Sequence, residues 1–220
     1  MHELIDHPCV QHKLAIIRDG ETGHKRFREL AREITMFVCY EALKTLPVRN
    51  VTVQTPMAEA TCSKIDTDLV VVPVLRAGIG MLDGILELVP TARVGFVGLE
   101  RDEETKAPVS YYNRFPPQVE GGTCIIIDPM VATGGSTAHA IDELKAAGAG
   151  TIFVVCIVSC PEGIKQVESA DPDVRLYAAA IDDHLDERIY IFPGLGDAGD
   201  RLFGTVHMYA ATGYPEPAGV

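Results

Sequence analysis

Short runs of apolar residues alternate along the chain with amphipathic segments, and this alternation predicts the fold class. The runs are rich in β-branched residues and carry almost no charge, which is typical of strands buried on both faces of a sheet. We expect strands over 69–75, 93–99, 124–127, 151–159, 175–181 and 189–192. Helical periodicity fills segments between them, at 81–88, 137–147 and 162–170. Strands that alternate with helices predict a mostly parallel, doubly wound α/β sheet.

The remaining segments have other patterns. A long helix begins near His24 and ends before Pro47, with one apolar face made by Phe27, Leu30, Ala31, Ile34, Phe37 and Val38. Residues 1–23 are mixed and are expected to form an arm, and 51–55 alternate like an edge or hairpin strand. Residues 100–118 are charged and proline-bearing, which predicts a long hairpin or a mobile lid.

Length and composition fit one folded domain over residues 1–220, with 206–220 as a flexible tail. The net charge of −12 argues against nucleic acid or an anionic membrane as the main partner. No apolar run reaches transmembrane length and the first residues do not resemble a signal peptide, so we expect a cytoplasmic protein. The six cysteines contain no C-x-x-C pair, which disfavours zinc or a disulfide framework.

One stretch carries the most chemistry: residues 124–137, Cys-Ile-Ile-Ile-Asp-Pro-Met-Val-Ala-Thr-Gly-Gly-Ser-Thr. A buried strand ends at Ile127, Asp128 follows, and a turn of small and hydroxylated residues leads into a helix. Gly134 and Gly135 allow backbone N–H groups to turn toward an anion, and the helix N-terminus adds partial positive charge. An ordinary strand-to-helix turn with a Ser or Thr cap is the alternative.

Two other nucleotide-binding motifs are disfavoured. Gly194-Leu-Gly-Asp-Ala-Gly199 fits G-x-G-x-x-G, but the 21 residues after Gly199 are too few for the βαβ unit of a dinucleotide site. The glycines at 78, 80 and 84 follow a strand, but the third stands one position late. A Walker loop would need a lysine after Gly135, and none is there.

Ligands of such sheets bind at the carboxyl ends of the strands. This rule predicts that one site contains Arg76, Arg101, Asp128 and the segment after Phe192. In that segment, residues 193–201 contain three glycines within six positions. Exposed backbone groups in such a loop can match the acceptor–donor–acceptor edge of a flat heterocycle. A structural turn with an Asp200–Arg201 surface pair is the alternative.

Four segments, in the same order, resemble the uracil phosphoribosyltransferase branch of the type I phosphoribosyltransferases. Residues 128–136 resemble the loop that binds phosphoribosyl pyrophosphate (PRPP), and their Asp-Pro-Met beginning is that of the uracil branch. Residues 75–78 resemble the pyrophosphate loop, and 193–205 resemble the uracil loop. The N-terminal motif is resembled by His7-Pro8, His12-Lys13-Leu14 and Phe27-Arg28-Glu29-Leu30. The resemblance implies a type I phosphoribosyltransferase-like fold with a small hood built partly from the C-terminal segment.

The resemblance implies transfer of the phosphoribosyl group from PRPP to uracil, with Mg²⁺ carried by PRPP, yielding UMP and pyrophosphate in pyrimidine salvage. It assigns catalysis to Asp128, Arg76, Arg101 and Asp197. PRPP binding falls to these four with Ala77, Gly78, Pro129, Met130, Val131, Ala132, Thr133, Gly134, Gly135 and Ser136. Uracil binding falls to Ile191, Gly196, Asp197 and Ala198. Asp197 is expected to meet PRPP and its Mg²⁺, through water.

The resemblance also implies possible effectors, and three residues depart from the family pattern. Some members respond to GTP or CTP. Separately from the resemblance, the apolar 27–43 helix favours a homodimer or homotetramer. Three residues depart from the family pattern: Glu100 where Tyr is frequent, Asp186 in place of Asn, and Ile189 in place of Gly. The rival hypotheses are a phosphoribosyltransferase for another base, a non-catalytic PRPP-sensing RNA-binding regulator, and a structural oligomer module. The net charge of −12 disfavours the regulator.

Overall fold

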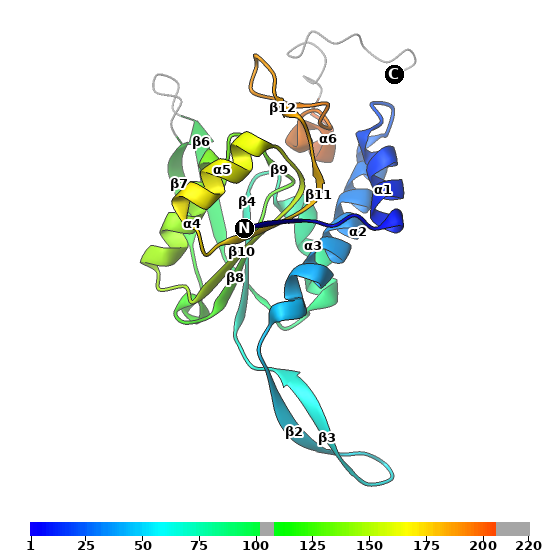
Figure 1. Cartoon of the computed structure of the whole chain (residues 1–220), viewed down its shortest axis with the longest axis vertical. Helices are drawn as coiled ribbons and strands as arrows, with labels where there is room; N and C mark the ends of the chain where they lie inside the picture. Colours follow the sequence, from blue (N-terminus) through cyan, green and yellow to red (C-terminus); the bar gives the residue numbers. More distant parts are fainter. Residues whose placement is uncertain (102–107, 206–220) are drawn as a thin grey trace.

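A central sheet organises the molecule (Figure 1). The computed structural model describes residues 1–101 and 108–205. The strand order is β1-β11-β10-β8-β4-β6-β7, and only the β6–β7 pair is antiparallel. The strands are β1 (His2–Leu4), β4 (Leu69–Leu75), β6 (Phe96–Arg101), β7 (Pro108–Arg114), β8 (Thr123–Ile127), β10 (Thr151–Ser159) and β11 (Arg175–Ile181), with short β5 (Arg93–Val94) and β9 (Met130–Val131) attached. The predicted mostly parallel α/β sheet is confirmed.

Helices cover both faces of this sheet. On one face lie α1 (Pro8–Arg18), α2 (His24–Ala42) and α3 (Ile79–Leu88), and on the other lie α4 (Gly135–Ala146) and α5 (Pro161–Ala170) (Figure 1). Successive residues of β8 alternate between the two cores: Ile125 and Ile127 pack with the α1–α3 layer, and Cys124 and Ile126 with the α4–α5 layer. A strand buried on both faces needs no polar positions, which explains the uniformly apolar runs in the sequence.

The N-terminal segment contains elements that its mixed composition did not predict. Strand β1 adds a parallel edge to β11, and α1 buries Val10, Leu14 and Ile17 against the core. Pro8 stands in the first turn of α1, and the His7 ring nitrogen Nδ1 accepts a hydrogen bond from the backbone N–H of Cys9 at 3.1 Å. Three buried positions in eleven residues are a weak periodic signal, so the helix depends on tertiary packing.

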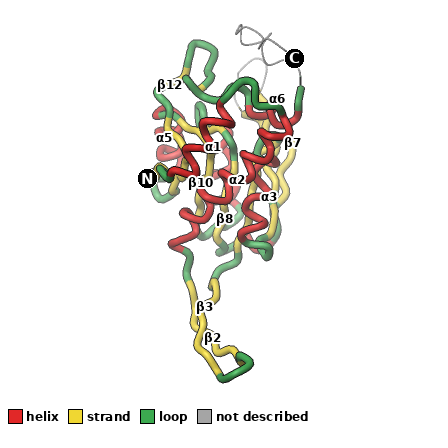
Figure 2. Tube along the Cα trace, turned by 90° about the vertical axis from the view of Figure 1, so that its right-hand side faces the viewer, coloured by secondary structure: helices red, strands yellow, loops and turns green. Residues whose placement is uncertain are grey.

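A two-stranded hairpin projects far from the sheet (Figures 1 and 2). It consists of β2 (Val48–Gln54) and β3 (Glu59–Ile65), which pair antiparallel over their whole length. The expected hairpin strand at 51–55 is confirmed, and its partner is a polar strand that has no apolar run. Most residues of both strands are exposed.

Other boundaries differ from the sequence expectations. The predicted 93–99 strand divides at Gly95 into β5 and β6. The β6–β7 pair confirms a hairpin within 100–118, but residues 102–107 of the expected lid, and the 206–220 tail, lie outside the described residues. Placing 189–192 in the central sheet is wrong, because β13 (Ile191–Phe192) pairs only with β12 (His184–Leu185) in a separate ribbon. The short helix α6 (Ala198–Phe203) follows this ribbon and was not predicted.

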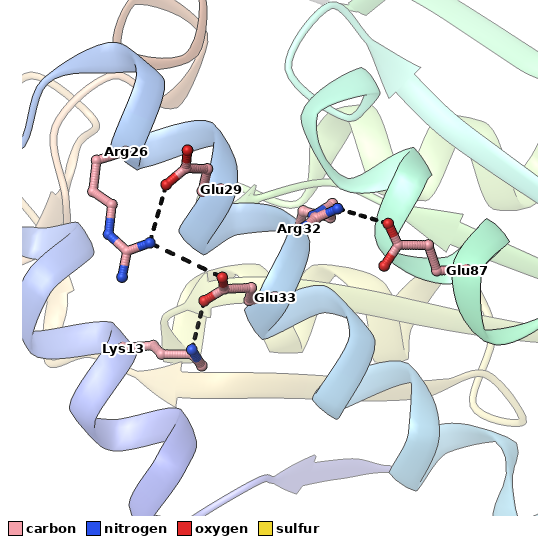
Figure 3. A network of polar contacts seen from close by, with 6 residues as sticks. All are labelled: Lys13, Arg26, Glu29, Arg32, Glu33 and Glu87. Atoms are coloured by element: carbon pink, nitrogen blue, oxygen red, sulfur yellow. Dashed lines mark hydrogen bonds and ion pairs between the residues drawn. The ribbon is translucent and has the colours of Figure 1, made fainter.

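Ion pairs connect the three helices of one face (Figure 3). Lys13 of α1 donates to Glu33 of α2 at 2.5 Å, and Arg26 of α2 lies 4.0 Å from the same carboxylate. Arg32 of α2 pairs with Glu87 of α3 at 2.6 Å. Lys13 therefore has a structural role within the N-terminal motif. No helix in the described part of the chain is long and apolar enough to span a membrane.

Candidate active site

A cavity of about 200 Å³ lies where β4 and β8 leave the sheet at their carboxyl ends. Three predicted segments, distant in sequence, meet around it: the 75–78 loop, the 128–136 loop and the 193–201 loop. Its walls are formed by Ala77, Asp128, Pro129, Met130, Ala132, Ile189, Tyr190, Gly196, Asp197, Ala198 and Gly199. This convergence is what the strand-end rule predicts for a parallel sheet.

A larger cavity of about 550 Å³ lies at the opposite edge of the sheet. It is lined by Thr123, Thr151 and Arg175, which are the first residues of β8, β10 and β11, and by the Lys145–Asp171 ion pair. None of the predicted site residues lines it. Size alone therefore does not identify the site, and the chemistry gathers at the carboxyl edge.

Asp128 is one of the two acidic side chains among the described residues that line the smaller cavity. It follows the last residue of β8, and its Oδ1 accepts a weak hydrogen bond from the backbone N–H of Met130 at 3.3 Å. Burial raises the pKa of this carboxyl from 3.8 to about 7, and the Met130 hydrogen bond opposes the shift. The carboxylate is destabilised until a ligand supplies donors, which is a feature of binding sites.

The loop after Asp128 is held from behind by β10 and α5. The carbonyl of Pro129 accepts from Ile157 and Val158, the carbonyl of Val131 accepts from the Ser159 hydroxyl at 3.0 Å, and the carbonyl of Ala132 accepts from the Cys160 thiol at 3.2 Å. The α5 backbone also approaches closely, since a Cβ on Gly163 would lie 2.3 Å from the Val131 carbonyl oxygen. With these carbonyls engaged on one side, the loop is fixed before any ligand arrives.

Gly134 and Gly135 make the turn into α4. Gly134 has a φ of 75°, and an added Cβ would lie 2.7 Å from the Gly163 carbonyl oxygen, so only glycine fits there. No side chain caps the α4 N-terminus, and the backbone N–H of Gly135 makes only a long 3.4 Å contact with the Thr133 hydroxyl. A Ser or Thr cap, the alternative left open by the sequence, is therefore absent from this helix, and its first amides remain available to an anion.

The 75–78 loop, which is predicted to bind pyrophosphate, follows β4, and Gly78 lets it turn back against the sheet. A Cβ on Gly78 would lie 2.5 Å from the Ile127 carbonyl oxygen and 2.7 Å from backbone atoms of Val74. Arg76 is exposed, and Ala77 lines the cavity. Arg101 is the last residue of β6, which pairs in parallel with β4. Its backbone therefore lies at the same carboxyl end of the strands as that of Arg76.

The 193–201 loop, which is predicted to bind the base and is called the base loop below, follows the β12–β13 ribbon and leads into α6. Gly194 and Gly196 have φ angles of 61° and 78°, while Ile191, Leu195 and Ala198 are buried. Asp197 is the N-cap of α6, because its Oδ1 accepts from the backbone N–H of Asp200 at 2.9 Å. One oxygen of the predicted PRPP-facing carboxylate is thus already engaged in the fold.

Known proteins resemble this chain over most of its length. The family model described as "Uracil phosphoribosyltransferase" matches residues 4–205. The chain belongs to the uracil phosphoribosyltransferase family. A uracil phosphoribosyltransferase from Halalkalibacterium halodurans is 53% identical over 203 residues, which are 92% of this chain and 97% of the relative. A uracil phosphoribosyltransferase from Lacticaseibacillus paracasei is 51% identical over 203 residues, which are again 92% of this chain and 97% of the relative.

Solved structures agree with this fold. The AQ2163 protein from Aquifex aeolicus superposes with a TM-score of 0.89 at 35% identity, covering 93% of this chain and 99% of that chain. An adenine phosphoribosyltransferase from Trypanosoma brucei superposes with a TM-score of 0.55 at 14% identity, covering 88% and 85%. The second likeness shows the fold alone. The fold class inferred from the four motifs, type I phosphoribosyltransferase-like, is confirmed.

Two departures from the family pattern meet beside the cavity. Ile189 has a φ of 69°, the left-handed region that a β-branched residue rarely adopts and that glycine adopts freely. Asp186 stabilises this turn, since its Oδ1 accepts from the backbone N–H groups of Arg188 at 2.9 Å and Tyr190 at 2.8 Å. An Asn oxygen would accept the same bonds, so Asp186 preserves the turn while Ile189 strains it.

The sequence interpretation missed some of the residues at this site. Tyr190 and Ile189 line the cavity, although neither was among the predicted base-binding residues. An aromatic residue directly before Ile191 was the available signal. Arg201 is buried at 5% exposure and donates to the carbonyl of Leu195 at 2.8 Å, so the surface ion pair proposed as an alternative for this turn is wrong.

Proposed function

We propose that this chain catalyses the reaction uracil + PRPP → UMP + pyrophosphate, a step of pyrimidine salvage. One observation carries the proposal: the three segments that resemble the pyrophosphate loop, the PRPP loop and the uracil loop of the family meet at one cavity of about 200 Å³. Membership of the uracil phosphoribosyltransferase family supports the choice of base.

The PRPP loop would bind the 5′-phosphate, with backbone N–H groups and hydroxyls of residues 132–136 as donors. Its rigid seat on β10 and α5 supports this role, because preorganised donors bind an anion without a reorganisation cost. The uncapped N-terminus of α4 adds its partial positive charge.

Arg76 and Arg101, with the backbone of Ala77 and Gly78, would bind the pyrophosphate. Negative charge builds on this leaving group as the ribose–oxygen bond breaks, and a guanidinium can donate two parallel hydrogen bonds to it. The parallel pairing of β4 with β6 supports the joint assignment, because it brings both strand ends to one edge.

Asp128 would accept hydrogen bonds from the ribose hydroxyls and stabilise the positive charge that develops at C1′. Its raised pKa supports this role, since the ribose hydroxyls supply donors that the carboxylate lacks in the protein alone.

The base loop would recognise uracil through the backbone of Ile191, Gly196 and Ala198. Two amide N–H groups and one carbonyl oxygen complement an edge that presents acceptor, donor and acceptor. Cytosine reverses two of these groups, which would leave polar atoms unpaired in the cavity and reject it. The positive φ angles of Gly194 and Gly196 support a backbone role for this turn.

Mg²⁺, the divalent cation proposed here, would enter with PRPP and neutralise charge on the leaving pyrophosphate. Asp128 and Asp197 are the carboxylates lining the cavity, and Mg²⁺ prefers six oxygen ligands, so most would come from pyrophosphate and water. Asp197 has one oxygen engaged as a helix cap, which supports contact with the metal through water by the other.

The projecting β2–β3 hairpin supports a homodimer or a homotetramer. An isolated two-stranded hairpin is marginally stable in water, and most of this one is exposed. A second copy would cover it. Sedimentation of the full chain tests this proposal, and a monomer at micromolar concentration would contradict it. GTP and CTP, added separately to the assay below, test the effectors of some family members.

Pyrophosphate release from PRPP and Mg²⁺ tests the function, with uracil, cytosine, hypoxanthine and orotate supplied in turn. We expect turnover with uracil and at most about 1% of that rate with cytosine. Turnover with hypoxanthine instead of uracil would favour the rival purine enzyme. An absence of turnover with uracil would refute the proposal.

Asp197→Asn tests the assignment of Asp197. The variant keeps an oxygen that can accept from Asp200, so α6 should survive, while the charge available to PRPP and its metal is lost. We expect turnover to fall about 100-fold with an unchanged circular dichroism spectrum. A rate near that of the unmodified chain would remove Asp197 from the site.

A further inference from the structure

A closed ring of polar contacts joins the base loop to the end of α1. Arg18, the last residue of α1, makes a two-pronged ion pair with Asp182, with both nitrogen–oxygen distances at 2.7 Å. Arg18 Nη1 also donates to the carbonyl of Gly194 at 2.7 Å, and Asp182 Oδ2 accepts from the backbone N–H of Gly194 at 2.8 Å. Both backbone groups of one base-loop residue are therefore held by a single charged pair.

The ring closes through Arg201. Its guanidinium lies 4.5 Å from the centre of the Phe27 ring and donates to the carbonyl of Leu195 at 2.8 Å. It also donates to the backbone carbonyl of Asp19, the residue after Arg18. Gly194 and Leu195 are thus tied to the end of α1 from two sides.

The anchors of this ring are rigid. Asp182 follows β11, is 8% exposed, and its own backbone N–H donates to the Ser159 carbonyl at 2.8 Å. Arg18 belongs to a helix whose apolar face is buried in the core. A charged pair at such a place is costly to bury and expensive to break, because loss of one partner leaves the other unpaired.

We propose that Arg18 and Asp182 are positioning residues for base recognition: they fix the backbone of residues 194–196 so that the following turn presents its amides and carbonyls to the base. This inference rests on the proposed function. Neither residue lines the cavity, so both act through Gly194. The PRPP loop is held by the Ser159 hydroxyl and the Cys160 thiol, and Asp182 hydrogen-bonds to Ser159 through its backbone N–H. Substitution of the Asp182 or Arg18 side chain should therefore affect the base alone.

Arg18→Lys and Asp182→Asn test the inference. Lysine keeps the positive charge but cannot reproduce the planar fork, and asparagine removes the charge that Arg18 needs. We expect the KM for uracil to rise roughly 10- to 100-fold, with the KM for PRPP within about twofold of the unmodified chain. The ratio of kcat/KM for uracil to that for cytosine should fall about tenfold.

Arg32→Lys is the matched control. Arg32 pairs with Glu87 at a similar 2.6 Å on the same helical layer and does not contact the base loop in the described contacts. We expect both KM values of this variant to stay within about twofold of the unmodified chain. Because each KM and the uracil-to-cytosine ratio do not depend on how much of the protein is folded, simple destabilisation cannot imitate the expected result.

Hydrogen exchange of the amides at 194–196 gives a readout that needs no turnover. It should accelerate in Arg18→Lys and not in Arg32→Lys. Unchanged exchange, or an equal rise of both KM values, would overturn the inference. If the unmodified chain turns over no base, the proposed function fails, and the exchange comparison still decides whether Arg18 holds the loop.

Discussion

The two halves of the cavity are built in opposite ways. The half proposed to bind phosphate, called the phosphate half below, belongs to one continuous loop, residues 128–136, of which Asp128, Pro129, Met130 and Ala132 line the cavity. The next strand and helix along the chain, β10 and α5, hold this loop. The half proposed to bind the base, called the base half below, comes from residues 189–199, and Arg18 of α1 and Asp182 beyond β11 hold it at Gly194. One half is local in sequence, and the other depends on a contact between residues 176 positions apart.

This difference has a physical basis. A phosphate is an anion that any ring of backbone amides at a helix N-terminus can bind, so a short glycine-rich turn suffices. A planar base must be read by backbone groups at defined positions, and a loop alone does not hold such positions against its own flexibility. Long-range contacts supply the rigidity, and substitutions should therefore affect the two halves separately.

Asp128→Asn should have the largest effect on the phosphate half. We expect kcat/KM to fall about 100-fold or more, because the amide cannot stabilise the charge at the ribose. The same variant should be more stable than the unmodified chain by about 1–3 kcal/mol at pH 8, since it removes a buried carboxylate. Steady-state kinetics and urea unfolding measure the two effects.

The stability gain should depend on pH in a defined direction. The pKa of Asp128 is raised from 3.8 to about 7, so the folded protein binds this proton more tightly than the unfolded chain does. Its favourable contribution is present at low pH and is lost as the pH rises from about 4 to about 7. The difference in unfolding free energy between the Asp128→Asn variant and the unmodified chain should widen over this range and stay constant above it. A constant difference from about pH 4 to pH 8 would contradict the assigned pKa.

Substitution of a single glycine should impair either the phosphate half or the base half of the cavity, and leave the other half intact. In Gly134→Ala the new Cβ meets the Gly163 carbonyl at 2.7 Å, and in Gly194→Ala it meets the Ile191 carbonyl at 2.1 Å, both at positive φ. Each should cost about 2–4 kcal/mol of unfolding free energy. We expect Gly134→Ala to raise the KM for PRPP and Gly194→Ala to raise the KM for uracil.

Gly135→Ala is the stability control for these variants. Its nearest neighbour would be the Thr133 hydroxyl at an ordinary 3.6 Å, and its φ is not positive. We expect a change within about 0.5 kcal/mol in urea unfolding. If all three variants lost equal stability, steric fit at these glycines would not explain the loop geometry.

Ile189→Gly should stabilise the base half, because it relieves backbone strain. Ile189 is 45% exposed, so little burial is lost, and glycine adopts a φ of 69° without penalty. We expect a net gain of about 0.5–1 kcal/mol after the entropy cost of glycine. Ile65→Gly, at a similar 44% exposure in a strand, should instead lose stability. Thermal unfolding distinguishes the two, and a loss in both variants would refute the strain.

Arg32→Gln should have the smallest effect. The Arg32–Glu87 pair is short at 2.6 Å, but its side chains are 40% and 47% exposed, so water screens it. We expect a loss of at most about 0.5 kcal/mol, which disappears in about 1 M salt. A loss comparable to that of Arg18→Gln, whose partner Asp182 is buried, would show that burial does not separate the two pairs.

Much of the fold was predictable because the central strands are buried on both faces and leave uninterrupted apolar runs. The exceptions share a cause. Helix α1, strand β3 and helix α6 are short or polar, so their stability comes from packing or pairing rather than from a periodic pattern. The strand expected at 189–192 is only the two-residue β13, and its place in the central sheet was wrong for a similar reason, since a ribbon of two such short strands has no pattern of its own.

The sequence by itself predicted the 128–136 loop motif, because Asp128, the glycines and the start of the following helix are adjacent in the chain and shape the local backbone. Its support by β10 and α5 is a tertiary contact. Tertiary structure decided the rest of the site. Arg201 was expected at the surface but is a buried donor. Ile189 lies in a left-handed turn beside the cavity, and Arg18 contacts Gly194. Such contacts depend on how the α1 and β11 ends meet in space, and no spacing in the chain encodes that distance.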